Sequence, residues 1–300
     1  MKIGMIGLGK MGHNLALNMK DNGIDVVAYS RSPEKVDMMK EEGIQGVYTI
    51  DELCESFEEQ RVIWLMVPAG EIVDNVISQL EGNLSKGDII IDGGNSHYRD
   101  SIRRYEKLAK IGVRFIDIGT SGGMEGARSG ACMMIGGDDE AFEKLEEVFW
   151  KICVRNGYSY IGRSGSGHYV KMIHNGIEYG MLQAIGEGFE IIQKSDFDID
   201  FEDLSKVWSH GSVIRGWLME LCRRAFEKDP CLEGVRGVID SSGEGLWTLE
   251  EALRLQVPAS VMAQSLFARY YSKDADSFSA KVIASLRNEF GGHSVTKRQG

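Results

Sequence analysis

The sequence lacks any arrangement of cysteines that would indicate a metal site or a disulfide framework. Its five cysteines are odd in number, lie far apart and include no C-x-x-C pair. We therefore expect neither zinc ligands nor disulfides among them, and we interpret them as thiols buried in the fold. They are Cys54, Cys132, Cys153, Cys222 and Cys231.

Long hydrophobic runs are also absent from the sequence. No apolar stretch approaches the roughly 18 residues that a membrane-spanning helix needs. Residues 1–12 alternate apolar side chains with glycines and do not form the apolar stretch of a signal peptide. We expect a soluble, cytoplasmic protein without a membrane partner.

Positive charge is scarce relative to negative charge. The chain has 34 Lys and Arg against 45 Asp and Glu, a formal net charge of −11. This balance argues against a nucleic acid or an anionic membrane as the main partner. An anionic small-molecule substrate would need a local cluster of basic residues. An arginine or lysine within a motif is therefore stronger evidence for an anion-binding site here than it would be in a basic protein.

The first half of the sequence alternates short β-rich apolar runs with helical stretches. This pattern is typical of a parallel sheet covered by helices. We predict strands at Lys2–Ile6, Asp25–Tyr29, Val62–Val67, Asp88–Ile91, Arg114–Ile118 and Cys132–Ile135. We predict helices at 11–22, 33–42, 71–81, 97–110 and 139–150.

After about Tyr169 the strand signals end, and apolar residues recur three and four apart, as they do in helices. A chain of 300 residues with 43% hydrophobic content can bury two cores. We predict a Rossmann-like, doubly wound parallel α/β domain over residues 1–165. An all-α domain for substrate binding and dimerisation should follow over 166–300, with the boundary in the glycine-rich stretch 162–167. Residues 289–300 are polar and aperiodic and should not pack by themselves.

The sequence Gly7-x-Gly9-x-x-Gly12 follows the first predicted strand and opens a helix. Gly7 permits the tight turn, Gly9 lets backbone amides approach a pyrophosphate, and Gly12 lets helix and sheet pack closely. Unpaired N–H groups at the helix start attract the anion. We therefore predict a site for NAD or NADP. Its predicted contacts are Gly7, Leu8, Gly9, Lys10, Met11, Gly12, Ser30, Arg31, Ser32, Val67, Pro68 and Asn95.

The end of the second predicted strand bears on the choice between the two cofactors. It ends in Tyr29-Ser30-Arg31-Ser32, without the acidic residue that binds a ribose 2′-hydroxyl. Arg31 between two hydroxyls suits a 2′-phosphate, which favours NADP. Alternatively, Arg31 stacks on adenine and the protein uses NAD.

Four polar residues share one face of a predicted helix in the second half. Lys171, His174, Asn175 and Glu178 fall at i, i+3, i+4 and i+7. A solvated helix face would give the same pattern. The apolar residues throughout 169–181 indicate instead a largely buried helix whose polar stripe borders a cleft, because buried Lys and Glu are rare unless paired or functional.

Residues 167–179, GHYVKMIHNGIEY, resemble the signature segment of 6-phosphogluconate dehydrogenases. Five further motifs have counterparts in the same order: DGGNS at 92–96, SGG with GA at 121–127, GLWT at 245–248, FARY at 267–270 and RNEFGGH at 287–293. The resemblance extends from residue 2 to about 293 and is to the short bacterial type of the family.

The resemblance implies that Lys171 is the general base for the C3 hydroxyl of the substrate while hydride leaves C3 for the nicotinamide. The resulting 3-keto acid loses its carboxylate as carbon dioxide, and Glu178 then protonates C1 to give ribulose 5-phosphate. Burial fits both roles, because it favours a neutral lysine and a protonated carboxyl. We expect no metal, since a cationic lysine can polarise the ketone.

The resemblance also implies the substrate contacts and the assembly. Asn95, Ser121, Gly122, Gly123, His174 and Asn175 correspond to groups around the carboxylate and hydroxyls. We expect the two glycines to allow close approach of the backbone to the substrate; the alternative is an ordinary turn. Tyr179, Thr248, Arg269, Arg287 and His293 correspond to groups around the phosphate and in the C-terminal tail. The resemblance also implies a homo-oligomer, either a dimer or a tetramer, in which the tail of one subunit completes the active site of its neighbour.

One position departs from the family pattern. Longer members have a lysine where this sequence has Leu246, so one phosphate cation is missing. Either another basic residue replaces it or phosphate binds more weakly.

Two other functions are compatible with parts of this pattern. A β-hydroxyacid dehydrogenase of the 3-hydroxyisobutyrate type would share the nucleotide fold, the Ser-Gly-Gly loop and the lysine, but it should lack Glu178 and the phosphate ligands. A non-catalytic dinucleotide sensor would need neither Lys171 nor Glu178. Because Lys171 and Glu178 are both in place, the 6-phosphogluconate dehydrogenase interpretation is favoured over both alternatives.

Overall fold

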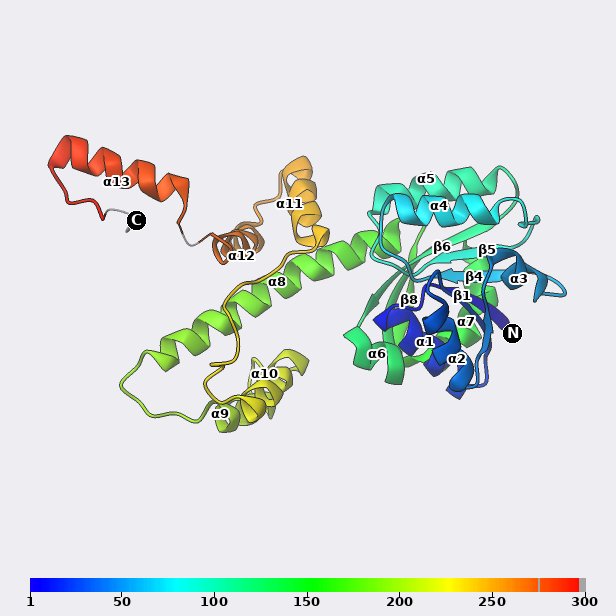
Figure 1. Ribbon diagram of the computed structural model, residues 1–300, viewed down its shortest axis with the longest axis horizontal. Helices are drawn as coiled ribbons and strands as arrows, with labels where there is room; N and C mark the ends of the chain where they lie inside the picture. Colours follow the sequence, from blue (N-terminus) through cyan, green and yellow to red (C-terminus); the bar gives the residue numbers. More distant parts are fainter. Residues whose placement is uncertain (275, 297–300) are drawn as a thin grey trace. The chain divides into compact units, whose positions relative to one another are not determined.

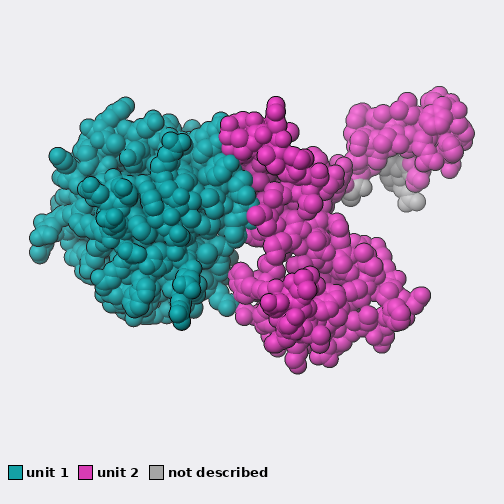
Figure 2. Space-filling model, turned by 180° about the vertical axis from the view of Figure 1, so that it is seen from behind, with its two compact units in different colours: residues 1–175 teal, residues 176–300 magenta. Residues whose placement is uncertain are grey.

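The computed structural model describes residues 1–274 and 276–296. The chain forms two compact units, Met1–Asn175 and Gly176–Gly300 (Figure 2). The predicted domain boundary at 165/166 lies ten residues before this division, at the start of the helix that contains both 175 and 176. No helix in the described ranges is long and apolar enough to cross a membrane.

The first unit is built on an eight-stranded sheet in the order β3-β2-β1-β4-β5-β6-β7-β8 (Figure 1). All neighbouring strands are parallel except β6 and β7. The strands are β1 (Lys2–Ile6), β2 (Asp25–Tyr29), β3 (Gln45–Val47), β4 (Val62–Leu65), β5 (Ile89–Asp92), β6 (Arg114–Ser121), β7 (Ala131–Gly137) and β8 (Cys153–Gly162). The first six strands have the order of a dinucleotide-binding Rossmann fold.

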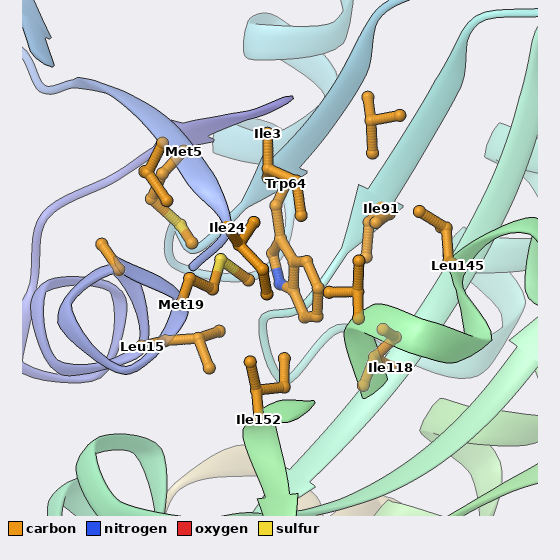
Figure 3. Close-up of a cluster of buried hydrophobic side chains, with 14 of the residues drawn as sticks. Ile3, Met5, Leu15, Met19, Ile24, Trp64, Ile91, Ile118, Leu145 and Ile152 are labelled. Atoms are coloured by element: carbon orange, nitrogen blue, oxygen red, sulfur yellow. The ribbon is translucent and has the colours of Figure 1, made fainter. Parts of the chain in front are cut away.

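Helices cover both faces of this sheet, which gives the unit two apolar cores. They are α1 (Lys10–Asp21), α2 (Pro33–Glu41), α3 (Ile50–Glu55), α4 (Glu71–Leu80), α5 (Tyr98–Ala109), α6 (Gly123–Ser129) and α7 (Asp139–Ile152). Alternate residues of each strand face opposite cores. Trp64 (Figure 3) and Val62 pack with α1 and α7, whereas Ile63 and Leu65 pack with α3 and α4.

The predicted strands and helices of the first half are confirmed, with ends that shift by a few residues. The prediction missed four short or polar elements, β3, α3, α6 and β8. The predicted doubly wound parallel fold is confirmed, with one pair of strands that departs from parallel pairing. Residues 122–130 connect β6 to β7 and are too few for the crossover of a dozen or more residues that parallel strands require, so β7 runs antiparallel to β6.

The cysteines correct a second expectation. Cys54 is buried and Cys153 and Cys222 are half-buried, but Cys132 and Cys231 are exposed. Cys132 follows a buried residue on β7, at a position where the alternation of the strand turns the side chain to solvent. Composition alone could not reveal this.

The second unit is helical, as predicted. The helix α8 (Ser166–Gln193) begins in the first unit and continues into the second. It is followed by α9 (Phe201–Ser209), α10 (Trp217–Lys228), α11 (Gly243–Leu255), α12 (Ser260–Tyr271) and α13 (Phe278–Gly291). The buried core of this unit is small and contains Phe189, Met219 and Phe226. The helix α13 has no buried residue, and its last turn includes the start of the segment 289–300 that we expected not to pack.

Candidate active site

The glycine-rich loop between β1 and α1 shows which glycines the fold itself requires. Gly7 has a φ of +102°, and a Cβ there would lie 2.4 Å from the backbone oxygen of Met66. A Cβ at Gly12 would lie 2.0 Å from the backbone oxygen of Gly7. A Cβ at Gly9, in contrast, would meet no protein atom within 4 Å. Packing therefore explains Gly7 and Gly12, and the open space at Gly9 is available to a ligand.

The first turn of α1 suits an anion. Its N-cap is Gly9, which offers no side-chain cap, and the first turn has no acidic residue and begins with Lys10. The Leu8 side chain is buried in the core, and the Met11 side chain packs against this core. At these two predicted cofactor contacts, a ligand can therefore reach mainly the backbone.

The residues predicted to bind the adenosine ribose lie at the end of β2. Arg31 is exposed, and Ser30 and Ser32 are half-buried. Within the described ranges, no hydrogen bond or ion pair engages the Arg31 side chain. Its guanidinium is therefore available to a ligand.

The amine of Lys171 lies at the centre of a polar cluster in the first unit. Lys171 is only 7% exposed, and its Nζ donates to Asn175 Oδ1 at 2.7 Å and lies 3.4 Å from His174 Nδ1. The Nδ1 of His174 lies 3.1 Å from the same oxygen, and its Nε2 lies 3.2 Å from Ser121 Oγ. The structure thus brings four of the predicted site residues together.

The start of α8 is seated directly on the sheet, which fixes where Lys171 lies. A Cβ at Gly119 of β6 would lie 2.2 Å from the Cβ of Lys171, and one at Gly167 would lie 2.3 Å from the backbone oxygen of Asp117. The buried carboxylate of Asp117 accepts hydrogen bonds from the backbone N–H groups of Gly165 and His168, at 2.7 and 2.9 Å. Such a bond to the first N–H groups of a helix is a strong cap.

Asp117 and Gly119 were not predicted from the sequence. The only available signal was the placement of an aspartate and a glycine within an otherwise apolar strand, IDIGT.

Glu178 is half-buried and lies two turns beyond Lys171 on the same continuous helix. Seven residues of helix correspond to a rise of about 10 Å along α8. The expectation of a largely buried helix holds only for its first part. Ile177 and Met181 are 49% and 50% exposed, whereas Met172, nearer the start of the helix, is 2% exposed.

The Ser-Gly-Gly loop after β6 needs its glycines for conformation. Gly122 has a φ of +102° and Gly123 of +59°, a region that favours glycine. Gly122 is also the N-cap of α6. The turn alone therefore accounts for both glycines, and close approach of a substrate is an additional use that remains a prediction.

A second cluster forms within the second unit. Tyr179 is buried, its hydroxyl lies 3.2 Å from Ser242 Oγ, and the guanidinium of Arg269 stands 3.4 Å from the centre of its ring. Cβ atoms at Gly176 and Gly245 would collide with Thr248 and with the Tyr179 ring, so α8 and α11 pack closely here. The Thr248 hydroxyl donates to the Glu244 backbone oxygen at 2.8 Å, and Leu246 is exposed.

Arg287 and His293 are not drawn into this cluster. Both side chains are exposed, and the one ring contact of His293 is with Phe290 on the same helix end. Among the residues that the structure describes, no group of three or more His, Cys, Asp or Glu side chains is placed to hold a metal ion.

Comparison with known families agrees with this arrangement in both units. Residues 2–162 match the model of the NAD binding domain of 6-phosphogluconate dehydrogenase, and residues 167–297 match that of the 6-phosphogluconate dehydrogenase C-terminal domain. The chain belongs to the 6-phosphogluconate dehydrogenase family. It is therefore an oxidoreductase of the decarboxylating type with a dinucleotide-binding domain.

Individual relatives match along the whole chain. A Bacillus subtilis protein named "Putative 6-phosphogluconate dehydrogenase YqeC" is 53% identical, over 99% of this chain and 100% of its own length. A Haloferax volcanii protein named as an NAD(+)-dependent, decarboxylating 6-phosphogluconate dehydrogenase is 40% identical, over 99% of both chains.

Among solved structures, 6-phosphogluconate dehydrogenase of Plasmodium falciparum, described with NADP+ and with its substrate, has a TM-score of 0.82 and 32% identity. The match covers 99% of this chain and 66% of that longer one. The similarity therefore includes both units.

Proposed function

We propose that the protein oxidises 6-phosphogluconate at C3 and decarboxylates the product to ribulose 5-phosphate, with reduction of NAD(P). The observation that carries this proposal is the buried amine of Lys171, hydrogen-bonded to Asn175 and close to His174 and Ser121. Family membership supplies the reaction class.

Lys171 is the proposed general base. An amide oxygen accepts hydrogen bonds but carries no charge, so Asn175 orients the amine without favouring its protonated form as a carboxylate would. The neutral amine takes the proton of the C3 hydroxyl, and a nicotinamide cofactor held at the glycine-rich loop would supply the acceptor for the hydride from C3. The proton on Lys171 then polarises the new C3 ketone.

The ketone makes the second step possible. The carboxylate lies β to the carbonyl, so the C1–C2 bond breaks, carbon dioxide leaves, and the electron pair enters an enediol whose C3 oxygen takes the proton from Lys171. Glu178 donates a proton to the carbon that becomes C1 of ribulose 5-phosphate, and Lys171 takes back the proton of the former C3 oxygen, which becomes the C2 ketone of the product. Glu178 is half-buried and lies on the same helix as Lys171.

Substrate binding is proposed to use both clusters. Ser121, His174 and Asn175, with Asn95, Gly122 and Gly123, would bind the carboxylate and hydroxyls. Tyr179, Thr248 and Arg269 would bind the phosphate, with Arg287 and His293 supplied by a second chain. Leu246 occupies the position of a lysine in longer family members. Among the described residues of this cluster, Arg269 is therefore the one cationic phosphate ligand.

We propose NADP as the cofactor in preference to NAD. The support is the exposed guanidinium of Arg31, flanked by Ser30 and Ser32, at the end of β2. The alternative is NAD, with Arg31 stacked on adenine.

The test is a steady-state assay of NADH and NADPH formation, with 6-phosphogluconate and with 3-hydroxyisobutyrate as substrates and with NAD and NADP side by side. We expect turnover of 6-phosphogluconate with release of carbon dioxide, and a higher kcat/KM with NADP. Turnover of 3-hydroxyisobutyrate but not of 6-phosphogluconate would show that the proposal is wrong.

A further inference from the structure

We propose that Arg104 of α5 is a positioning residue that holds two ligand-facing loops of the first unit in a fixed position relative to each other. The β4 loop, residues 66–70, contains Val67 and Pro68, and the β5 loop, residues 93–97, contains Asn95. The inference rests on the proposed function only in assuming that these loops contact the dinucleotide and the substrate.

The side chain of Arg104 is 1% exposed and bonds to both loops at once. Its Nη2 donates to the backbone oxygen of Gly70 at 2.9 Å, in the β4 loop. Its Nη1 donates to Ser96 Oγ at 3.1 Å, in the β5 loop, and to Asp92 Oδ2 at 3.1 Å, at the end of β5. The planar fork of a guanidinium allows one side chain to span both loops.

The buried charge of Arg104 is balanced on both sides. Asp92 is fully buried, accepts a hydrogen bond from Ser96 Oγ at 2.7 Å and lies 3.3 Å from the backbone nitrogen of Gly94. On the other side, Arg104 Nε donates to Asp74 Oδ1 at 2.9 Å. A buried ion pair is weak evidence for added stability, because desolvation offsets much of the attraction. A role in fixing geometry explains it better.

The two loops also touch each other and the glycine-rich loop. A Cβ at Gly94 would lie 2.8 Å from the backbone oxygen of Val67, and one at Gly7 would lie 2.4 Å from that of Met66. Three loops at the carboxyl ends of β1, β4 and β5 therefore form one packed layer. Since glycines leave the backbone free to move, a rigid cross-link such as Arg104 fixes what the glycines alone do not.

The sharpest test is Arg104→Lys, which keeps the positive charge beside Asp92 but cannot bond to Gly70 and Ser96 together. The readout is the Kd for NADPH and for NADH, titrated by fluorescence on protein shown to be folded by circular dichroism. We expect Kd to rise at least about tenfold, or about 1.4 kcal/mol, and the KM for 6-phosphogluconate to rise more than kcat falls.

The matched control is Arg103→Lys. Arg103 is the next residue on α5 and shares Asp74 as a partner, but it bonds to neither loop. We expect its Kd values to stay within about twofold of wild type. A Kd within about twofold for Arg104→Lys as well would overturn the proposal, since a purely structural arginine would lower only the melting temperature.

If Arg104→Lys does not fold, Ser96→Ala tests the same link, because it removes the hydroxyl that Arg104 holds in the β5 loop and leaves the Arg104–Asp92 pair intact. We expect a higher KM for 6-phosphogluconate and a higher Kd for the dinucleotide; unchanged values would overturn the proposal. Dinucleotide binding is measured without turnover. Suppose that the wild-type protein binds NADPH but does not oxidise 6-phosphogluconate, and that Arg104→Lys loses the NADPH binding. This result would support the positioning role and contradict the proposed function.

Discussion

The two units differ in how much apolar surface they bury within one chain. The first unit encloses two large cores on the two faces of its sheet. The second has one small core of three buried residues, and many of its large apolar side chains are exposed. Among the most exposed are Val207, Val213, Leu253, Val261, Tyr271, Phe278 and Phe290.

This difference shows that the first unit completes its own fold, whereas the helices of the second present apolar faces that another chain can cover. Exposed apolar side chains recur on α9, α11, α12 and α13, and large exposed apolar surfaces are typical of interaction sites. They support the proposed homo-oligomer and fit the absence of any buried residue on α13.

The largest expected effect is in the core of the first unit. Trp64→Ala removes a fully buried indole and should lower the free energy of unfolding by about 3–5 kcal/mol, measured by urea denaturation. The control is Trp150→Ala, which removes an exposed indole from the same unit and should change that free energy by less than about 0.5 kcal/mol. Equal losses in the two variants would contradict the description of this core.

The next effect concerns the proposed contribution of a second chain. Truncation after Leu286 removes Arg287 and His293 and should raise the KM for 6-phosphogluconate at least about tenfold, because a hydrogen bond to a charged group contributes about 1.5–3 kcal/mol. The Kd for the dinucleotide should stay within about twofold of wild type, since its proposed site lies in the first unit. An unchanged KM for 6-phosphogluconate would refute completion of the site by a neighbouring subunit.

The elements that were predicted from the sequence are those with strong periodicity. The strands β1 and β2 match their predicted bounds because each is a run of buried apolar residues beside a turn. The strand β3 and the helix α6 are too short to show a period, and β8 is a partly exposed strand with polar residues. Local patterns could not reveal them.

For the site, the helical spacing of Lys171, His174 and Asn175 was enough to predict that they lie together. The bonds of Arg104 to Gly70 and Asp92 were not predictable, because they join residues that are far apart in sequence and adjacent only in the folded sheet.

A smaller effect tests the electrostatics beside this arginine. Burial alone would raise the pKa of the Asp74 carboxyl, but Arg104 and Arg103 outweigh it and lower the pKa from 3.8 to about 2. A depressed pKa stabilises the folded state above about pH 4, and this contribution is lost as the pH falls through 2. After a discount for solvent screening, Asp74→Asn should lower the free energy of unfolding by about 1 kcal/mol at pH 7 and by about half as much at pH 3.

The control for that prediction is Asp100→Asn, since Asp100 is a more exposed partner of Arg103 and does not bond to Arg104. Urea denaturation of this variant should show little difference from wild type at either pH. A penalty for Asp74→Asn that does not change between pH 7 and pH 3 would contradict the assignment.

The smallest effect distinguishes two neighbouring thiols. Burial, with a smaller contribution from Cys132, raises the pKa of Cys153 to about 12, so almost none of it is thiolate at neutral pH. Iodoacetamide should therefore label the exposed Cys132 and Cys231 first and Cys153 far more slowly, as read by peptide mass spectrometry. Equal labelling rates would contradict the half-burial of Cys153 at the start of β8.

The central claim is that Lys171 and Glu178, two turns apart on α8, act in successive steps. It is tested most directly by following carbon dioxide release and deuterium incorporation at C1 of ribulose 5-phosphate in deuterium oxide, for wild type, Lys171→Ala and Glu178→Ala. We predict that Lys171→Ala forms neither NAD(P)H nor carbon dioxide above about a thousandth of the wild-type rate, and that Glu178→Ala is impaired in deuterium incorporation at C1. Normal turnover by Lys171→Ala, or wild-type carbon dioxide release with full deuterium incorporation by Glu178→Ala, would contradict it.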